Sequence, residues 1–195
     1  MSSSITSLIA LDTVNSTSSY LAGIAETLPH GAVVSAYAQT AGRGQRGNSW
    51  EAEPGANLTF SMLLRPDGLR AAEQFSLSEA VALGITSALR HYLPDTDVCI
   101  KWPNDIYAAN RKICGILIEN SLIGSSIRHS IAGIGLNVNQ TVWRSDAPNP
   151  ISMAQIAGHG FDRDEVLERV CLEIMHELSL PGTHRHDRYM QSLWG

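Results

Sequence analysis

The chain has 195 residues, of which 44% are hydrophobic and 17% charged, a size and composition that suit one sizeable globular domain. The 14 Lys and Arg residues against 19 Asp and Glu give a formal net charge of −5, so there is no basic excess of the kind that nucleic-acid or membrane-surface binding favours. We therefore expect a single domain over residues 1–195, with neither nucleic acid nor a membrane as a partner.

The three cysteines are odd in number and far apart, which argues against a disulfide framework or a zinc site. Cys114 lies inside an apolar stretch and is expected to be an inert buried thiol. Residues 1–7 do not resemble a signal peptide, and no apolar run approaches the roughly 18 residues that a membrane helix needs. These features predict a soluble protein of the reducing cytoplasm.

The first half of the chain predicts strands and one short helix. We expect a strand over residues 5–11, a helix over 18–25, and further strands over 32–38 and 57–64. Asn15, Ser16 and Thr17 are small polar residues of the kind that cap a helix, and they stand just ahead of the first helix. A glycine-rich stretch, residues 42–47, follows the second strand.

The second half of the chain begins with a long helix over residues 73–92, whose apolar positions recur with a period near 3.6. Three strands are expected at residues 98–102, 113–119 and 127–137, with turns at 103–105 and 120–126. A second helix is expected over 162–177, because Asp162 and Glu165 stand at capping-box spacing. Together the elements predict an α+β fold, a mixed sheet flanked by helices.

The glycine-rich stretch literally satisfies GxGxxG, the dinucleotide-binding fingerprint. That fingerprint needs a helix at its last glycine, whereas here Pro54 and Gly55 follow closely and would break one. The loop still offers main-chain N–H groups, two guanidinium groups and the indole of Trp50, which suit a phosphate and a flat ring. Taken alone, a tight surface loop with incidental arginines explains it as well.

Four more segments occur in a fixed order with this loop. They are Pro54-Gly55-Ala56-Asn57-Leu58, Lys101-Trp102-Pro103-Asn104-Asp105, Arg111-Lys112 opening Ile113-Cys114-Gly115-Ile116-Leu117-Ile118-Glu119, and Gly133-Ile134-Gly135-Leu136-Asn137-Val138-Asn139. With the loop they resemble the catalytic domain of biotin–protein ligases over roughly residues 11–194. The resemblance implies the fold of the biotin-synthetase and class II aminoacyl-tRNA-synthetase group. Residues 1–11 show no helix-turn-helix, and we expect the chain to be a catalytic domain without the small C-terminal β-barrel domain that relatives usually have.

The resemblance implies a binding site for biotin and its adenylate. The family's Ser-Thr-Asn turn corresponds to Ser16, Thr17 and Ser18, which departs at the third residue, and Trp50 resembles a tryptophan that covers biotin. Many relatives have an arginine where this chain has Gln45. The full set implied for biotin and the adenylate is Ser16, Thr17, Ser18, Gln39, Gly42, Arg43, Gly44, Gln45, Trp50, Lys101, Gly115, Gly133 and Gly135.

Two cations are expected to carry the chemistry. A carboxylate must approach the α-phosphate of ATP, and a fixed cation offsets the repulsion between the two anions. We predict Lys101 and Arg43 for this role, although a lysine beside a core tryptophan, Trp102, can equally be a surface residue. The residues expected near ATP phosphates and Mg²⁺ are Asn104, Asp105, Arg111, Lys112 and Asn137, with no definite set of metal ligands.

The activity implied by the resemblance has two steps. Biotin and ATP form biotinyl-5'-AMP with release of pyrophosphate, and the biotinyl group then passes to a lysine of a biotin carboxyl carrier protein. ATP and Mg²⁺ are the implied cofactors, and a homodimer is the state in which relatives often occur. Two alternatives remain at this point, a lipoate or octanoate ligase of the same superfamily and a non-catalytic biotin-binding module.

Overall fold

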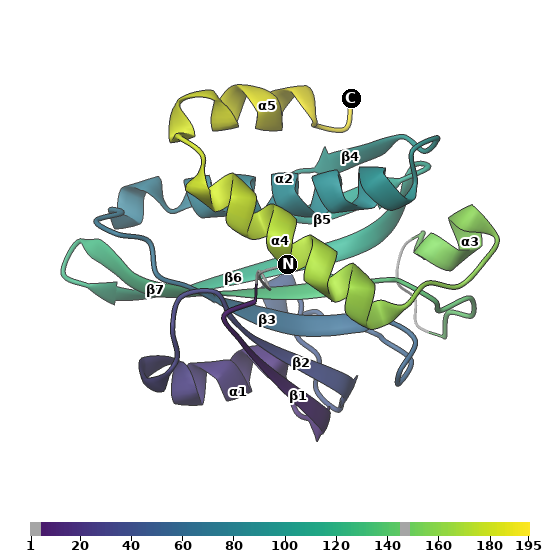
Figure 1. Ribbon diagram of the computed structural model, residues 1–195, viewed down its shortest axis with the longest axis horizontal. Helices are drawn as coiled ribbons and strands as arrows, with labels where there is room; N and C mark the ends of the chain where they lie inside the picture. Colours follow the sequence, from purple (N-terminus) through teal and green to yellow (C-terminus); the bar gives the residue numbers. More distant parts are fainter. Residues whose placement is uncertain (1–4, 145–148) are drawn as a thin grey trace.

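The computed structural model describes residues 5–144 and 149–195. Its centre is a seven-stranded sheet in the order β1-β2-β3-β7-β6-β5-β4, shown in Figure 1. β1 (Ser7–Val14) runs parallel to β2 (Ala32–Gln39), and the other neighbouring strands pair antiparallel. The remaining strands are β3 (Leu58–Leu64), β4 (Val98–Lys101), β5 (Asp105–Ala108), β6 (Arg111–Ile123) and β7 (Ser126–Leu136). The expected mixed sheet is therefore confirmed.

The α-helices are α1 (Thr17–Ile24), α2 (Phe75–Tyr92), α3 (Met153–Ala157), α4 (Arg163–Ser179) and α5 (Arg185–Gln191). Single 3₁₀ turns occur at η1 (Ala25–Thr27), η2 (Gln45–Gly47), η3 (Ala71–Glu73) and η4 (Gly182–His184). Ser16 is the N-cap of α1, and Asp162 is the N-cap of α4, where its carboxylate accepts from two main-chain N–H groups of the first turn. No described helix is long and apolar enough to cross a membrane.

The helices cover the two faces of the sheet unequally. α2 and α4 lie on one face, over the larger core, while α1 lies on the opposite face (Figure 1). The smaller core beneath α1 includes Leu21, Leu63 and Ile131, all nearly or fully buried. Because strand side chains alternate between faces, Ser61 and Gly133 face the same side as Leu63 and Ile131. That side carries the site.

Short elements account for the differences from the sequence expectation. Of β5 only Asp105 had been assigned, to the turn over 103–105, and α3 was not expected at all, because stretches of four and five residues hardly establish a period. β6 continues through Ile123, so the connection to β7 consists of residues 124–125 instead of a turn over 120–126. The chain then closes the edge of the sheet, because the Ile100 N–H donates to the Ser192 carbonyl and the Trp194 N–H donates to the Ile100 carbonyl.

Candidate ligand-binding and active site

A pocket of about 360 Å³ opens on the α1 side of the sheet. It is walled by the first turn of α1, the end of β2, the loop of residues 42–50, the turn before β5, and the centres of β6 and β7. Fourteen of the residues expected from the sequence line it: Ser16, Thr17, Ser18, Gln39, Arg43, Gly44, Gln45, Trp50, Asn104, Asp105, Lys112, Gly115, Gly133 and Gly135. The fold therefore brings together residues up to 119 positions apart, from Ser16 to Gly135.

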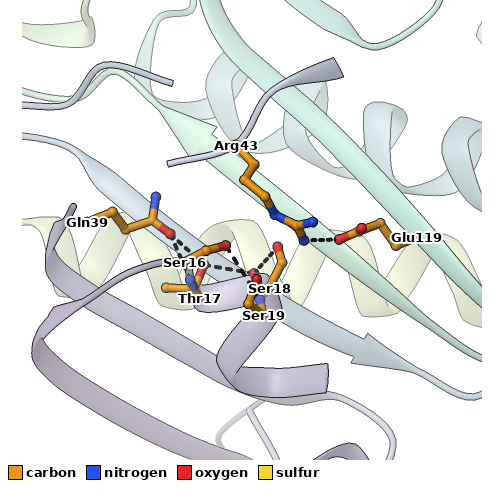
Figure 2. Close-up of polar contacts among 8 residues, drawn as sticks. Ser16, Thr17, Ser18, Ser19, Gln39, Arg43 and Glu119 are labelled. Carbon is orange, nitrogen blue, oxygen red and sulfur yellow. Dashed lines mark hydrogen bonds and ion pairs between the residues drawn. The ribbon is translucent and has the colours of Figure 1, made fainter. Parts of the chain in front are cut away.

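One end of the pocket is a set of uncharged hydrogen-bonding groups (Figure 2). The Gln39 carboxamide oxygen accepts from the Thr17 main-chain N–H at 2.8 Å and from its hydroxyl at 3.2 Å. The Thr17 hydroxyl also lies 2.8 Å from the Ser61 hydroxyl, which lies 2.9 Å from that of Ser18. Thr17, Ser18 and Ser61 are all buried, so this end offers fixed polar atoms with little competing water.

The floor of the pocket is a pair of glycines. Gly115 of β6 and Gly135 of β7 are directly opposite each other in the sheet. The Trp50 indole lies on them so closely that a Cβ atom at Gly135 would be 2.2 Å from the ring, and one at Gly115 would be 2.9 Å away. Any larger residue at these positions would collide with a flat group placed here. The Trp50 indole N–H is buried and finds no hydrogen-bond partner among the described residues.

Two cations line the pocket, and each is paired with a carboxylate. Lys112 Nζ lies 2.8 Å from Asp105 Oδ1, and 5.7 Å from the centre of the Trp50 ring. Arg43, on the glycine-rich loop, forms an ion pair with Glu119 of β6 (Figure 2). Both ion pairs are partly exposed, with side chains 21–42% accessible, so each contributes about 1 kcal/mol or less to the stability of the fold. A ligand phosphate can therefore compete for either cation.

Lys101, which was expected at the reacting groups, does not line this pocket. Lys101, Asp105 and Gly115 lie opposite one another on β4, β5 and β6, so Lys101 is two strand spacings, roughly 10 Å, beyond the floor. Its ammonium donates to the Tyr107 hydroxyl at 3.0 Å and lies 5.0 Å from the centre of the Trp194 ring. The hydrogen bond with Tyr107 raises the pKa of Lys101, so it stays charged but engaged elsewhere.

Three other expected residues also lie outside the pocket lining. The Arg111 guanidinium donates to the Pro150 carbonyl. The Asn137 amide donates to the Ile151 carbonyl at 3.0 Å, and its buried Oδ1 has no partner among the described residues. These two side chains fasten the segment around residues 150–151 to the sheet instead of reaching a ligand. Gly42 supports the loop, because a Cβ there would be 2.7 Å from the Trp50 carbonyl.

Several lining residues were not expected as site residues. They are Asn48, Ser49, Phe60, Trp102, Pro103, Ile116, Leu117 and Ile134. Trp102 was expected in the core, yet it is 65% exposed and stands at the pocket, so that expectation was wrong. Ser61 was also missed, although it stands directly opposite Gly133 and its alternation with Leu63 would have placed it on the pocket face. Cys114 is free and fully buried, as expected, and burial raises its pKa.

Comparisons of the sequence with known proteins identify the family of the chain. Residues 10–137 match the model of the biotin/lipoate A/B protein ligase family. The bifunctional ligase/repressor BirA of Bacillus spizizenii is 37% identical over 174 residues, which is 85% of this chain and 51% of the relative. A biotin–[acetyl-CoA-carboxylase] ligase of Paracoccus denitrificans is 35% identical over 79% of this chain and 65% of its own length. The chain thus spans about half to two thirds of these relatives.

The fold has a close counterpart among solved structures. The biotin protein ligase from Aquifex aeolicus in complex with biotin and ATP matches with a TM-score of 0.82 at 28% identity, covering 97% of this chain and 79% of that chain. This likeness confirms the class II aminoacyl-tRNA-synthetase-like arrangement expected from the sequence. With more than half of its length matching the family model, the chain belongs to the biotin/lipoate A/B protein ligase family.

Proposed function

We propose that this chain is an ATP-dependent biotin–protein ligase. It would join biotin to ATP as biotinyl-5'-AMP, release pyrophosphate, and transfer the biotinyl group to a lysine of a biotin carboxyl carrier protein. The observation that carries the proposal is the division of one pocket into an uncharged hydrogen-bonding end, a glycine floor and a cationic side. A small ligand with a polar head and a carboxylate tail, and a nucleotide beside it, match these three parts.

The first step needs a cation between two anions. An oxygen of the biotin carboxylate attacks the α-phosphorus, and the bond from that phosphorus to the oxygen bridging to the β-phosphate breaks. Lys112, with its ammonium at the floor, and Arg43 on the loop are the groups that would stabilise the charge building on the phosphate oxygens. We therefore assign to Lys112 the role that the sequence suggested for Lys101.

The second step depends mainly on access of the carrier protein to the adenylate, and less on further catalytic groups. The carrier's lysine amine attacks the carbonyl carbon of the mixed anhydride, the carbon–oxygen bond to AMP breaks, and the amine releases a proton. AMP is a good leaving group, so no covalent intermediate with the protein is required. Trp102 is exposed at the pocket, so we propose it as one of the residues that a carrier protein would contact.

Mg²⁺ fits this site as part of the substrate MgATP. The described residues contain no cluster of three or more His, Cys, Asp or Glu side chains that could hold a metal ion. Asp105 is a carboxylate at the pocket beside the amide of Asn104, and magnesium typically takes one or two carboxylates with phosphate oxygens and water. Asp105 would be the protein's contribution, and the triphosphate would supply most other ligands.

A lipoate or octanoate ligase is not favoured, because the similar proteins are named as biotin ligases and the polar end of the pocket suits a ligand with several hydrogen-bonding groups. A binding module without turnover is also disfavoured, since two paired cations serve little purpose in binding biotin alone. We further propose one catalytic unit over residues 1–195, acting in the cytoplasm; three free, buried cysteines suit a reducing compartment.

Two measurements test the proposal. Exchange of labelled pyrophosphate into ATP should depend on biotin, and lipoate should not replace it. Mass spectrometry of a biotin carrier domain, incubated with the protein, biotin and MgATP, should show one added biotinyl group on a lysine. Biotin binding without any pyrophosphate exchange would identify a binding module, and exchange driven by lipoate would identify a lipoate ligase.

A further inference from the structure

Ser61 lies behind the pocket wall and links two residues that line it. It is fully buried on β3, opposite Gly133 of β7. Its hydroxyl is 2.8 Å from the Thr17 hydroxyl and 2.9 Å from the Ser18 hydroxyl. Each hydroxyl has a single proton to donate. The direction of the hydrogen bonds along this chain of three hydroxyls therefore decides whether the pocket offers a ligand a donor or an acceptor.

The main chain of Thr17 sets that direction. Its N–H can only donate, and it does so to the side-chain oxygen of Gln39 at 2.8 Å, which orients the amide. The Thr17 hydroxyl donates to the same oxygen at 3.2 Å, because two oxygens this close without a proton between them would repel each other. Figure 2 shows the Gln39 oxygen turned toward Thr17 and its nitrogen turned away.

The direction of the other hydrogen bonds in this series of hydroxyls follows from the bond between Thr17 and Gln39. With its own proton on Gln39, the Thr17 hydroxyl accepts from Ser61, and Ser61 in turn accepts from Ser18. The proton of Ser18 therefore points at Ser61, and only lone pairs of Ser18 remain for a ligand. Gly133 reinforces the arrangement, because a Cβ at that position would lie 2.6 Å from the Ser18 hydroxyl oxygen.

We propose that Ser61 is a positioning residue for ligand recognition, which orders the hydroxyl chain so that Ser18 selects a ligand N–H donor. The free Nε2 group of Gln39, for which the absent Cβ of Gly42 leaves room at 3.2 Å, donates to a neighbouring carbonyl oxygen of the ligand. An N–H next to a C=O is the edge of a urea or cyclic amide. The inference rests on the proposed function, in which the ureido ring of biotin provides this edge.

Two biotin analogues, each with one ureido N–H replaced by CH₂, test the hydrogen-bond direction without changing ring size. The unmodified protein should bind one of the two about 10-fold or more weaker than biotin by calorimetry. Ser61→Ala should weaken biotin binding about 5- to 10-fold and reduce the discrimination against that analogue, while kcat and the KM for ATP in pyrophosphate exchange change less than about twofold.

Thr59→Val is the matched control. Thr59 is buried on the same face of β3, but its hydroxyl donates to the Ala36 main-chain carbonyl, outside the chain of side-chain hydroxyls. This variant should keep both the affinity and the discrimination. Because Ser61 acts through Ser18, the Ser18→Ala and Ser61→Ala losses should not add in the double variant.

The outcomes separate the two levels of the proposal. Absence of biotin binding by the unmodified protein would reject the proposed function itself. Binding with equal affinity for biotin and both analogues would show that Ser18 accepts no ligand N–H, and would overturn only the role of Ser61. Full discrimination retained in a folded Ser61→Ala protein would do the same. If Ser61→Ala fails to fold, Ser18→Ala still decides, since undiminished discrimination in that variant would overturn the proposal.

Discussion

Replacing Lys112 with methionine is the sharpest test of the assigned chemistry, because it removes the charge and keeps most of the side chain's length. The ammonium is held 2.8 Å from Asp105 over the glycine floor, so it is positioned before any ligand arrives. Removing one such preorganised contact to transition-state charge typically costs about 3–4 kcal/mol, or about 10²- to 10³-fold in rate. The lost ion pair itself is partly exposed and accounts for only about 1 kcal/mol of stability.

The assay is single-turnover formation of biotinyl-adenylate, with biotin affinity measured separately. Biotin binding should change little, because the uncharged end of the pocket is left intact. Lys101→Met is the matched control: it removes the other lysine on the same face and should alter the rate less than about threefold. A larger loss from Lys101→Met than from Lys112→Met would refute this reasoning and restore the sequence-based assignment.

Three further outcomes are expected. Gln45→Arg adds a cation at the pocket and should retain the adenylate, so that labelling of a bystander protein such as albumin falls at matched adenylate formation; equal labelling would make Gln45 a neutral departure. Gly135→Ala places a methyl group 2.2 Å from the Trp50 ring, so biotin should bind at least about 10-fold weaker and the loop of residues 42–50 should be cut faster by protease. The hydrogen bond and charge of Glu79 raise the pKa of His186 above 6.5, so this pair stabilises the fold most below about pH 6.5 and loses its effect as pH rises through the folded-state pKa. The difference in Tm between the unmodified protein and His186→Asn should therefore shrink from pH 5.5 to pH 8.5, and a constant difference would contradict it.

Periodicity and capping residues predict the long elements well. The helix expected over residues 73–92 is α2, and the strand expected over 32–38 is β2 to within one residue. Local signals suffice here, because a face of many apolar residues or a capping side chain specifies the element on its own. β5 escapes prediction because Asn104 and Asp105 read as turn residues, while the pairing of Asp105 with Gly115 becomes visible only in the folded sheet.

The site was harder to predict because its geometry depends on register. Lys101 and Lys112 both adjoin motifs that suit phosphate chemistry, and only the pairing of β4, β5 and β6 shows which ammonium reaches the floor. The motif glycines are informative in the sequence, since each predicts a close approach, but what approaches Gly115 and Gly135 is a tryptophan more than sixty positions away. Ser61 has no motif of its own, and its importance appears through two hydroxyls on a different element.

The segment that closes the sheet beside β4 also affects how the protein behaves in concentrated solution. An uncovered strand edge is a template on which another chain can add a strand, and such addition is a common route to aggregation. Here the main-chain groups of Ile100 are already bonded to Ser192 and Trp194. A second molecule must displace this short segment before it can extend the sheet at β4. Residues 192–194 therefore hinder the addition of further strands at that edge. Removing them would expose both a sheet edge and the ammonium of Lys101 that the Trp194 ring now covers.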